Sequence, residues 1–154
     1  MSIEERIARA GIEIPHLDIP AAAYRPYVLH GGLLAISGQL PLHQAKPTAT
    51  GAVPSMVSVA EAKHAARQCA INVLAWARHA CQGDWDRIER VLRVGGYVVT
   101  SEGYFNAPEI INAASELITE VLGERGTHAR VAMGVASLPM NVSVEVEAML
   151  AVRA

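Results

Sequence analysis

The C-terminal segment of the chain alternates between two kinds of side chain from residue 142 to residue 150. The apolar set is Val142, Val144, Val146, Ala148 and Leu150, and the set between them is Ser143, Glu145, Glu147 and Met149. Successive side chains of a β-strand point to opposite faces, so this spacing predicts a strand with one face in a core and one face outside it. A chain that ends this way must build a sheet that is covered on one side.

Caps, turn residues and periodicity predict the other elements. They are a short helix over 2–10, two hairpin strands within 27–37, a long surface loop over 38–56, a helix between 58 and 83, a strand over 88–100, a helix between 106 and 123, and a strand over 128–136. The pattern after the first helix is ββαβαββ. It predicts an α+β domain in which both long helices cover one face of the sheet and one crossover brings parallel pairing.

The strand over 128–136 also has two faces. Arg130, Ala132, Gly134 and Ala136 alternate with the larger apolar residues of that strand. We expect the small residues and Arg130 to lie on the face away from the helices, together with Glu145. Small side chains permit close approach, so this face predicts a symmetric oligomer with binding sites at the subunit boundaries.

Composition excludes several classes of protein. The chain has 154 residues without a visible linker, and its residues are 51% hydrophobic and 18% charged, which describes one folded domain. A net charge of −2 makes nucleic acid a poor candidate partner. No apolar run is long enough to cross a membrane, and residues 1–10 lack the apolar core of a signal peptide, so we expect a soluble, cytoplasmic protein.

The two cysteines point to neither a disulfide nor a metal site. Cys69 and Cys81 are twelve residues apart on one predicted helix, which separates them by about 18 Å. This is too far for an intrachain disulfide. The sequence has no Cys/His cluster with zinc spacing, and we expect no metal and no cofactor.

Two segments at opposite ends of the chain resemble a known family. Residues 129–139, ARVAMGVASLP, followed by VEVEA at 144–148, resemble the C-terminal signature of the Rid family, also called the YjgF-like or endoribonuclease L-PSP family. The early signature is similar to Pro26-Tyr27 and ISGQLP at 36–41. The resemblance implies a chorismate-mutase-like fold, with a six-stranded sheet, two helices on one face and a trimeric barrel. It assigns residues 24–154 to that domain and leaves residues 1–23 as an added helix and an extended lead-in.

The resemblance also implies an activity and a set of site residues. Well-known members hydrolyse reactive 2-imino or enamino acids to 2-oxo acids and ammonia at clefts between subunits of a homotrimer. By motif position, Arg130 matches the arginine that binds the substrate carboxylate, and Glu145 matches the acidic residue beside the attacking water. The substrate-binding positions are Tyr27, Ser37, Gly38, Ala132 and Asn112. Ala132 stands where the family usually has a cysteine.

This chemistry suits the two charged residues. A guanidinium can hold a carboxylate through two parallel hydrogen bonds, which orients the neighbouring imine carbon. A carboxylate such as Glu145 can take a proton from the attacking water and return one to the departing amine. If position 132 acts through its backbone carbonyl, Ala132 keeps that role, whereas a role for the thiol would be lost.

Other readings of the same residues stay open. A protein of this fold could bind a 2-oxo acid or another small carboxylate without turnover, since Arg130 alone suffices for that. Ribonuclease activity is disfavoured by the charge balance, and mutase chemistry does not follow from fold alone. Each residue also has an ordinary structural role available: an interfacial ion pair for Arg130, a solvated strand face for Glu145, core packing for Tyr27, a turn for Ser37 and a helix-surface amide for Asn112.

Overall fold

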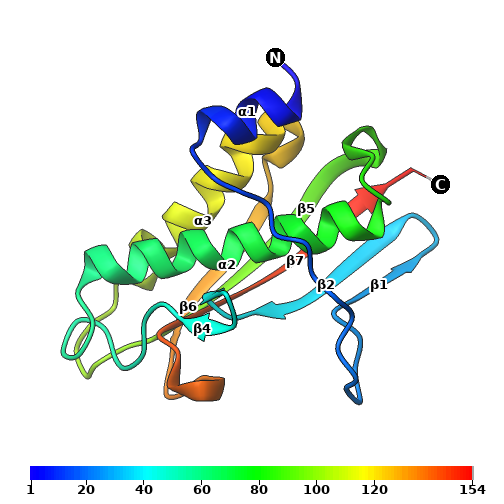
Figure 1. Ribbon diagram of the computed structural model, residues 1–154. Coiled ribbons are helices and arrows are strands. Elements are labelled where there is room, and N and C mark those ends of the chain that lie inside the picture. The colour runs from blue at the N-terminus through cyan, green and yellow to red at the C-terminus, as the bar shows by residue number, and fades with distance from the viewer. Residues whose placement is uncertain (154) are drawn as a thin grey trace.

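The computed structural model describes residues 1–153 and places them in two layers (Figure 1). The helices are α1 (Ile3–Arg9), α2 (Val59–Ala80) and α3 (Ala107–Leu122), with short 3-10 turns at Trp85–Arg87, Gly123–Gly126 and Pro139–Asn141. The strands are β1 (Tyr27–His30), β2 (Leu33–Gln39), β3 (Leu42–His43), β4 (Lys46–Pro47), β5 (Ile88–Val99), β6 (Ala129–Val135) and β7 (Val144–Val152). This order matches the predicted ββαβαββ pattern, with β3 and β4 added inside the predicted loop.

The main sheet has the order β1-β2-β7-β5-β6 within residues 1–153. Only β5 and β6 run parallel, because α3 connects them as a crossover, and the other neighbours are antiparallel. The sheet therefore has the five strands that the periodicity predicts and not the six that the family resemblance implies. The short strands β3 and β4 pair only with each other and stand apart from it.

Helices α2 and α3 lie side by side across one face of this sheet (Figure 1). The capping boxes expected at Ser2 and Ser58 are both formed and start α1 and α2. Asn106 precedes α3 as expected, but its side chain makes no cap. Its amide instead donates to Glu109 Oε2 at 2.7 Å, and its backbone, with φ −104° and ψ 39°, is not in the extended conformation usual for an N-cap residue.

One part of the predicted face assignment is wrong. On β7 the apolar set is buried under the helices and Glu145 and Glu147 lie on the open face, as expected. On β6 the faces are reversed. Arg130 pairs in register with Val94, which is fully buried under the helices, and its side chain reaches α3. The residues that face the helices are Arg130, Ala132 and Gly134, and those that face away are Val131, Met133 and Val135.

The close approach of α3 explains this reversal. A Cβ on Gly96, which pairs with Ala132, would lie 2.5 Å from Cγ2 of Ile111 in α3. Beside Gly96, the space under α3 therefore accepts only very small residues such as Ala132, and the larger apolar residues of β6 point to the open face. The prediction that the larger apolar side chains of β6 face the helices is wrong because the distance between α3 and the sheet, and not hydrophobicity, limits which residues fit there.

Gly96→Ala is expected to destabilise the protein by about 1–3 kcal/mol, because the added methyl group overpacks the contact with Ile111. Thermal unfolding followed by circular dichroism should show a lower Tm, by about 2–10 °C for a chain of this size. Adding Ile111→Val removes a methyl group from the same contact and should restore part of the loss. An unchanged Tm in the Gly96→Ala variant would contradict the close approach of α3.

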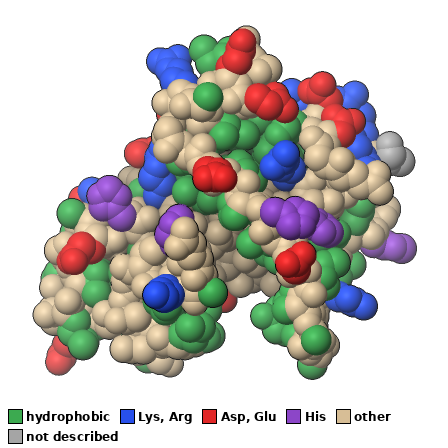
Figure 2. Space-filling view, in the orientation of Figure 1, with side chains coloured by type: hydrophobic (Ala, Val, Ile, Leu, Met, Phe, Trp, Pro, Cys, Tyr) green, Lys and Arg blue, Asp and Glu red, His purple; other side chains and the backbone are tan. Residues whose placement is uncertain are grey.

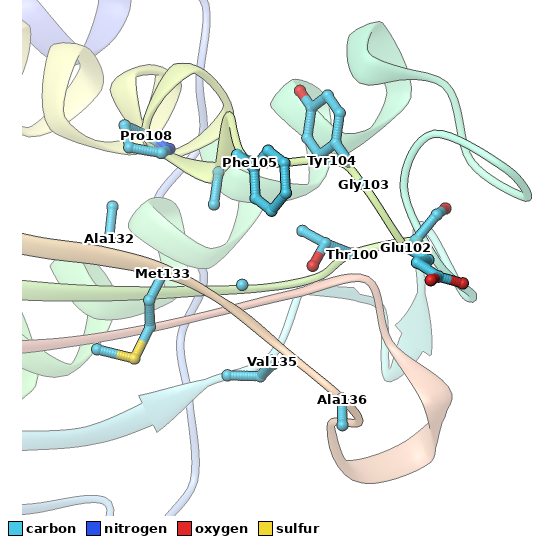
Figure 3. Close-up of a pocket in the computed structure, with 13 residues that line it drawn as sticks. Thr100, Glu102, Gly103, Tyr104, Phe105, Pro108, Ala132, Met133, Val135 and Ala136 are labelled. Carbon is cyan, nitrogen blue, oxygen red and sulfur yellow. The ribbon is translucent and has the colours of Figure 1, made fainter.

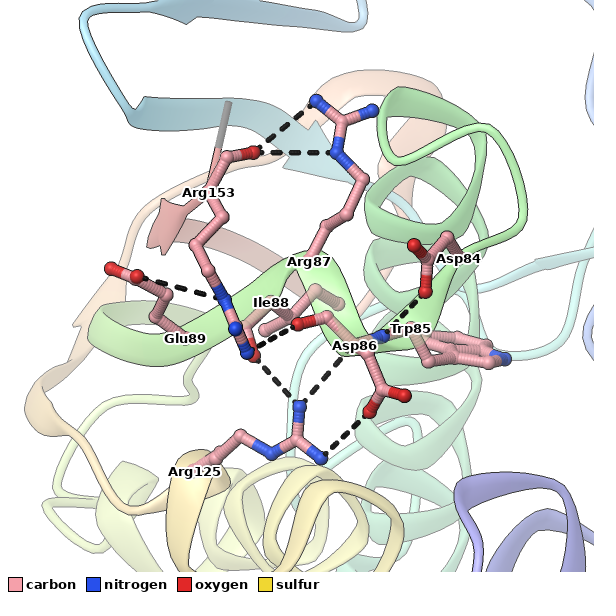
Figure 4. Close-up of polar contacts among 8 residues, drawn as sticks. All are labelled: Asp84, Trp85, Asp86, Arg87, Ile88, Glu89, Arg125 and Arg153. Carbon is pink, nitrogen blue, oxygen red and sulfur yellow. Dashed lines mark hydrogen bonds and ion pairs between the residues drawn. The ribbon is translucent and has the colours of Figure 1, made fainter.

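A polar network ties the start of β5 to Arg125, in the 3-10 turn before β6, and to Arg153, after β7 (Figure 4). The Arg125 guanidinium donates to the backbone oxygen of Ile88 at 3.0 Å and to Asp86 Oδ1 at 3.3 Å. Arg153 donates to the backbone oxygen of Asp86 at 2.8 Å, and Arg87 donates to that of Arg153. These contacts satisfy carbonyl groups where the sheet ends, so we regard this charge cluster as structural.

Candidate functional site

Arg130 lies on the edge strand β6 and points toward α3. Its Nη1 atom donates to Asn112 Oδ1 at 2.8 Å and to Ser115 Oγ at 3.3 Å. Asn112 and Ser115 are three residues apart, so they share one face of the helix. The guanidinium is exposed, and among the contacts of residues 1–153 only Nη1 is engaged. The other nitrogen atoms of Arg130 are free to bind a carboxylate in the two-pronged manner.

His128 and Ser115 complete the support of Arg130. His128 Nδ1 lies 2.6 Å from the backbone oxygen of Gly126, and Nε2 lies 2.9 Å from Ser115 Oγ. A carbonyl oxygen can only accept, which assigns the proton to Nδ1. With Nδ1 as the donor, Nε2 can accept the Ser115 hydroxyl proton, and a lone pair of Ser115 Oγ then remains for Arg130. The hydrogen bonds thus run in one direction, from Arg130 through Ser115 and His128 to the backbone.

Sequence reasoning included neither Ser115 nor His128 among the site residues. The spacing held the signal for both: His128 is two residues before Arg130 on one strand face, and Ser115 is three residues after Asn112 on one helix face. What the spacing could not show was that these two faces meet.

Glu145 lies on β7, on the open face of the sheet. This half-buried carboxylate packs against Gly38, at the bulge that interrupts the pairing of β2 with β7, and any side chain at position 38 would collide with it. Burial raises the pKa of the Glu145 carboxyl, and the neighbouring Glu147 raises it further. A carboxyl held this way changes its protonation state closer to neutral pH than an ordinary glutamate, which suits a general acid and base.

Two further residues of the open face, Arg93 and Tyr97, bind Glu147, the carboxylate beside Glu145. Glu147 Oε1 accepts from Arg93 Nη1 at 2.9 Å and from the Tyr97 hydroxyl at 3.0 Å. Burial, followed by the hydrogen bond to Glu147, raises the pKa of Tyr97, which stays a neutral donor. Glu147 therefore has an ion-pair partner in Arg93, whereas Glu145 has no such partner within the described chain.

Tyr27 and Ser37, near the opposite edge of the sheet, both form hydrogen bonds within the chain. The Tyr27 hydroxyl lies 3.0 Å from His79 Nδ1, and its ring packs against Trp76 of α2. Ser37 Oγ donates to the backbone oxygen of Arg25 at 2.7 Å. Strands β1 and β6 are the two edges of the sheet, four strand spacings or about 19 Å apart.

The predicted site residues therefore form separate groups within one chain. Arg130, Asn112 and Ala132 gather under α3 at the β6 edge, whereas Gly38 and Glu145 lie on the open face. Strand β7, which carries Glu145, is two strand spacings, or about 10 Å, from strand β6. The side chains of Glu145 and Arg130 also lie on opposite faces of the sheet. A single chain cannot bring Arg130 and Glu145 to one small molecule.

Comparison with known proteins gives the family. The model of the family described as "YjgF/chorismate mutase-like, putative endoribonuclease" matches residues 4–151. The chain belongs to the YjgF/chorismate mutase-like family. The protein TCP17 of Trypanosoma cruzi is 38% identical over 149 residues, which cover 96% of this chain and 92% of TCP17.

Two solved structures share nearly the whole fold. The crystal structure of the protein Atu1372 of Agrobacterium tumefaciens, of unknown function, is 43% identical, with a TM-score of 0.91 over 97% of this chain and 92% of its own. The crystal structure of a protein from Shewanella oneidensis described as a "putative endoribonuclease" is 29% identical, with a TM-score of 0.92 over 99% of this chain and 100% of its own. The predicted α+β, chorismate-mutase-like fold and the family resemblance are thereby confirmed.

Membership in the YjgF-like family supports a small-molecule-binding or deaminase-type role in general. Within residues 1–153, no helix has the length and apolarity needed to cross a bilayer. The same residues contain no cluster of three His, Cys, Asp or Glu side chains placed to hold a metal ion. On the face of the YjgF-like chain shown in Figure 2, acidic and basic side chains are interspersed, without a single-sign patch for a phosphate backbone.

Proposed function

We propose that this protein hydrolyses small, reactive 2-imino acids and their enamino tautomers to 2-oxo acids and ammonia. The observation that carries the proposal is the Arg130 guanidinium, which is exposed, fixed through one nitrogen by Asn112 and Ser115, and open at its other nitrogens. A guanidinium prepared in this way is suited to a planar carboxylate. Family membership is the second support.

The reaction needs few groups. Water adds to C2 of the imine, which is protonated on nitrogen, while Glu145 accepts one proton of the water, and this gives a carbinolamine. Glu145 then returns that proton to the nitrogen, the C–N bond breaks, and ammonia leaves as the hydroxyl group gives up its proton to solvent and the C2–O bond becomes a carbonyl. Every step is proton transfer and addition or elimination. The raised pKa of Glu145 allows the carboxyl to accept and return protons under mild conditions.

The placement of Arg130 and Glu145 makes this a site between subunits. The two side chains lie on opposite faces of one sheet, so Glu145 of one subunit would meet a substrate held by Arg130 of another. We propose a homotrimer with one such cleft between each pair of neighbours. The open face, which carries the exposed apolar residues Val28, Leu33, Met133 and Met149, is the surface proposed to face the other subunits.

The direct test uses imines made in place by an amino-acid oxidase and trapped with semicarbazide. The protein at micromolar concentration should lower the amount of trapped imine and leave the 2-oxo acid in its place. If decay of the imine is unchanged, the protein is not such a deaminase. Binding of a 2-oxo acid without turnover, measured by calorimetry, would instead support the alternative of a non-catalytic carboxylate-binding protein.

Ser115→Ala is expected to weaken binding of 2-oxobutanoate by about threefold to tenfold, because Arg130 and His128 both lose the hydroxyl that links them. Isothermal titration calorimetry measures the effect. Ser115→Thr keeps the hydroxyl and serves as the matched variant, with affinity expected near that of the original protein. Equal affinity for the Ala and Thr variants would show that this hydroxyl does not position Arg130.

A further inference from the structure

A cavity of about 510 Å³ opens between the start of α3 and strand β6 (Figure 3). Its volume lies within the range of small-molecule sites. Phe105, Ala107 and Pro108 line it from the helix side, and Ala132 and Gly134 line it from the strand side. None of these five side chains carries a charge or a polar atom, so this part of the cavity is apolar.

The contact between Arg130 and Asn112 lies beside this cavity, between the same helix and strand. Pro108 and Asn112 are four residues apart, which is one turn along the same face of α3. Arg130 and Ala132 are two residues apart on the same face of β6, or about 6.6 Å. Helix and strand therefore lead together from the Arg130–Asn112 contact into the cavity, with a cation at one end and apolar side chains at the other.

Phe105 is the most exposed large apolar side chain among residues 1–153, at 91%. Figure 3 shows its ring beside the start of α3, across from strand β6, whose Ala132, Met133 and Val135 line the other side of the cavity. An exposed aromatic ring opposite a strand side of small and aliphatic residues forms one half of a slot for a flat apolar group. Glu102, at the end of the cavity away from Ala132, disfavours a second negative charge there.

We infer that this cavity takes the side chain of the substrate, and that the preferred substrates are 2-imino acids with an aromatic side chain. The identity of the reacting group, a 2-imino acid, rests on the proposed function, whereas the preference for an aromatic side chain on the substrate rests on the cavity alone. A carboxylate on Arg130 places the neighbouring C2 atom at the mouth of the cavity. The aromatic ring then lies against Phe105, whereas an alanine-derived imine leaves the cavity empty.

Binding of three 2-oxo acids to the full chain tests this inference by calorimetry. Phenylpyruvate should bind at least about tenfold more tightly than pyruvate, since it buries an aromatic ring. 2-Oxoglutarate, with its second carboxylate, should bind no better than pyruvate. Phe105→Ala should lower the affinity for phenylpyruvate by about fivefold or more and leave that for pyruvate within about twofold. Ile19→Ala, which truncates an exposed apolar side chain outside the cavity, should change neither.

The outcomes separate this inference from the proposed function. Equal affinities for phenylpyruvate and pyruvate, or an equal loss of both in Phe105→Ala, would overturn the inference even if imines of both kinds are hydrolysed. If no imine is hydrolysed, the deaminase proposal fails. Phenylpyruvate binding that depends on both Arg130 and Phe105 would then still support the aromatic site. Faster turnover of the phenylalanine-derived imine than of the alanine-derived one, lost in Phe105→Ala, would support both.

Discussion

Arg130→Ala is expected to lower both the turnover of 2-imino acids and the affinity for 2-oxo acids by more than tenfold. A hydrogen-bonded anchor to a charged group contributes about 1.5–3 kcal/mol, which corresponds to about 10-fold to 150-fold. The loss follows from the position of Arg130 between β6 and α3, where its contacts with Asn112 and Ser115 fix the guanidinium in the orientation needed to bind a carboxylate. Semicarbazide trapping and calorimetry measure the two quantities.

Two further variants make this result specific. Arg130→Lys keeps the positive charge but loses the planar, two-pronged geometry, so only a small part of the activity should return. Arg90→Ala removes an exposed arginine of β5 that does not contact Arg130 or α3, and it should leave activity within about twofold. Full activity in Arg130→Ala would reject Arg130 as the carboxylate anchor, whatever the protein's reaction proves to be.

Glu145→Gln is expected to abolish most of the turnover while leaving 2-oxo acid binding nearly intact, since the amide cannot accept the proton of the attacking water. General acid and base catalysis is worth about 100-fold to 10,000-fold. Loss of affinity without loss of turnover would contradict this role. The same variant also tests whether the site is shared between subunits.

Mixing two inactive chains provides that test. When Arg130→Ala and Glu145→Gln chains are expressed together, each chain supplies the residue that the other lacks. In a ring of randomly mixed subunits, about a quarter of the clefts would contain an intact Arg130 and an intact Glu145. Purification through two different tags removes trimers made of one kind of chain. Each remaining trimer has one intact cleft of three, so these assemblies should regain about a third of the original activity. No recovery in verified mixed assemblies would show that the site does not combine Arg130 and Glu145 from different chains.

The pH dependence should follow the raised pKa of Glu145. Because the attack on the imine needs the ionised carboxylate, kcat/KM should fall on the acid side with a midpoint above the ordinary glutamate value. Glu147→Gln removes the nearby negative charge and should move that midpoint to lower pH. A midpoint that stays in place would contradict the charge interaction between Glu145 and Glu147.

The same carboxyl should affect stability with a definite sign. A folded-state pKa that is raised means that the native chain binds more protons than the unfolded chain between the two values, so the contribution of Glu145 to stability falls as pH rises through that range. Glu145→Gln should therefore raise the Tm at pH 7.5, by about 1–2 °C given the partial exposure of the group, and should have little effect at pH 4.

Local pattern predicted much of this fold because alternation, caps and turns act over a few residues. The 142–150 alternation located the buried and open faces of β7, and the capping boxes at Ser2 and Ser58 marked two helix starts. The site residues came from matching motifs to a family. The pairing of Arg130 with Asn112 has its physical account only in the structure, where α3 crosses back over β6.

What the sequence by itself determined was the order of elements, the face that β7 buries and the identity of the charged groups. Only the tertiary structure decided that β6 turns its small residues inward, because that choice depends on how closely Ile111 of α3 approaches Gly96. It also joined Ser115 to His128 and separated Arg130 from Glu145 across the sheet. Such juxtapositions depend on distances between segments far apart along the chain, which no local spacing contains.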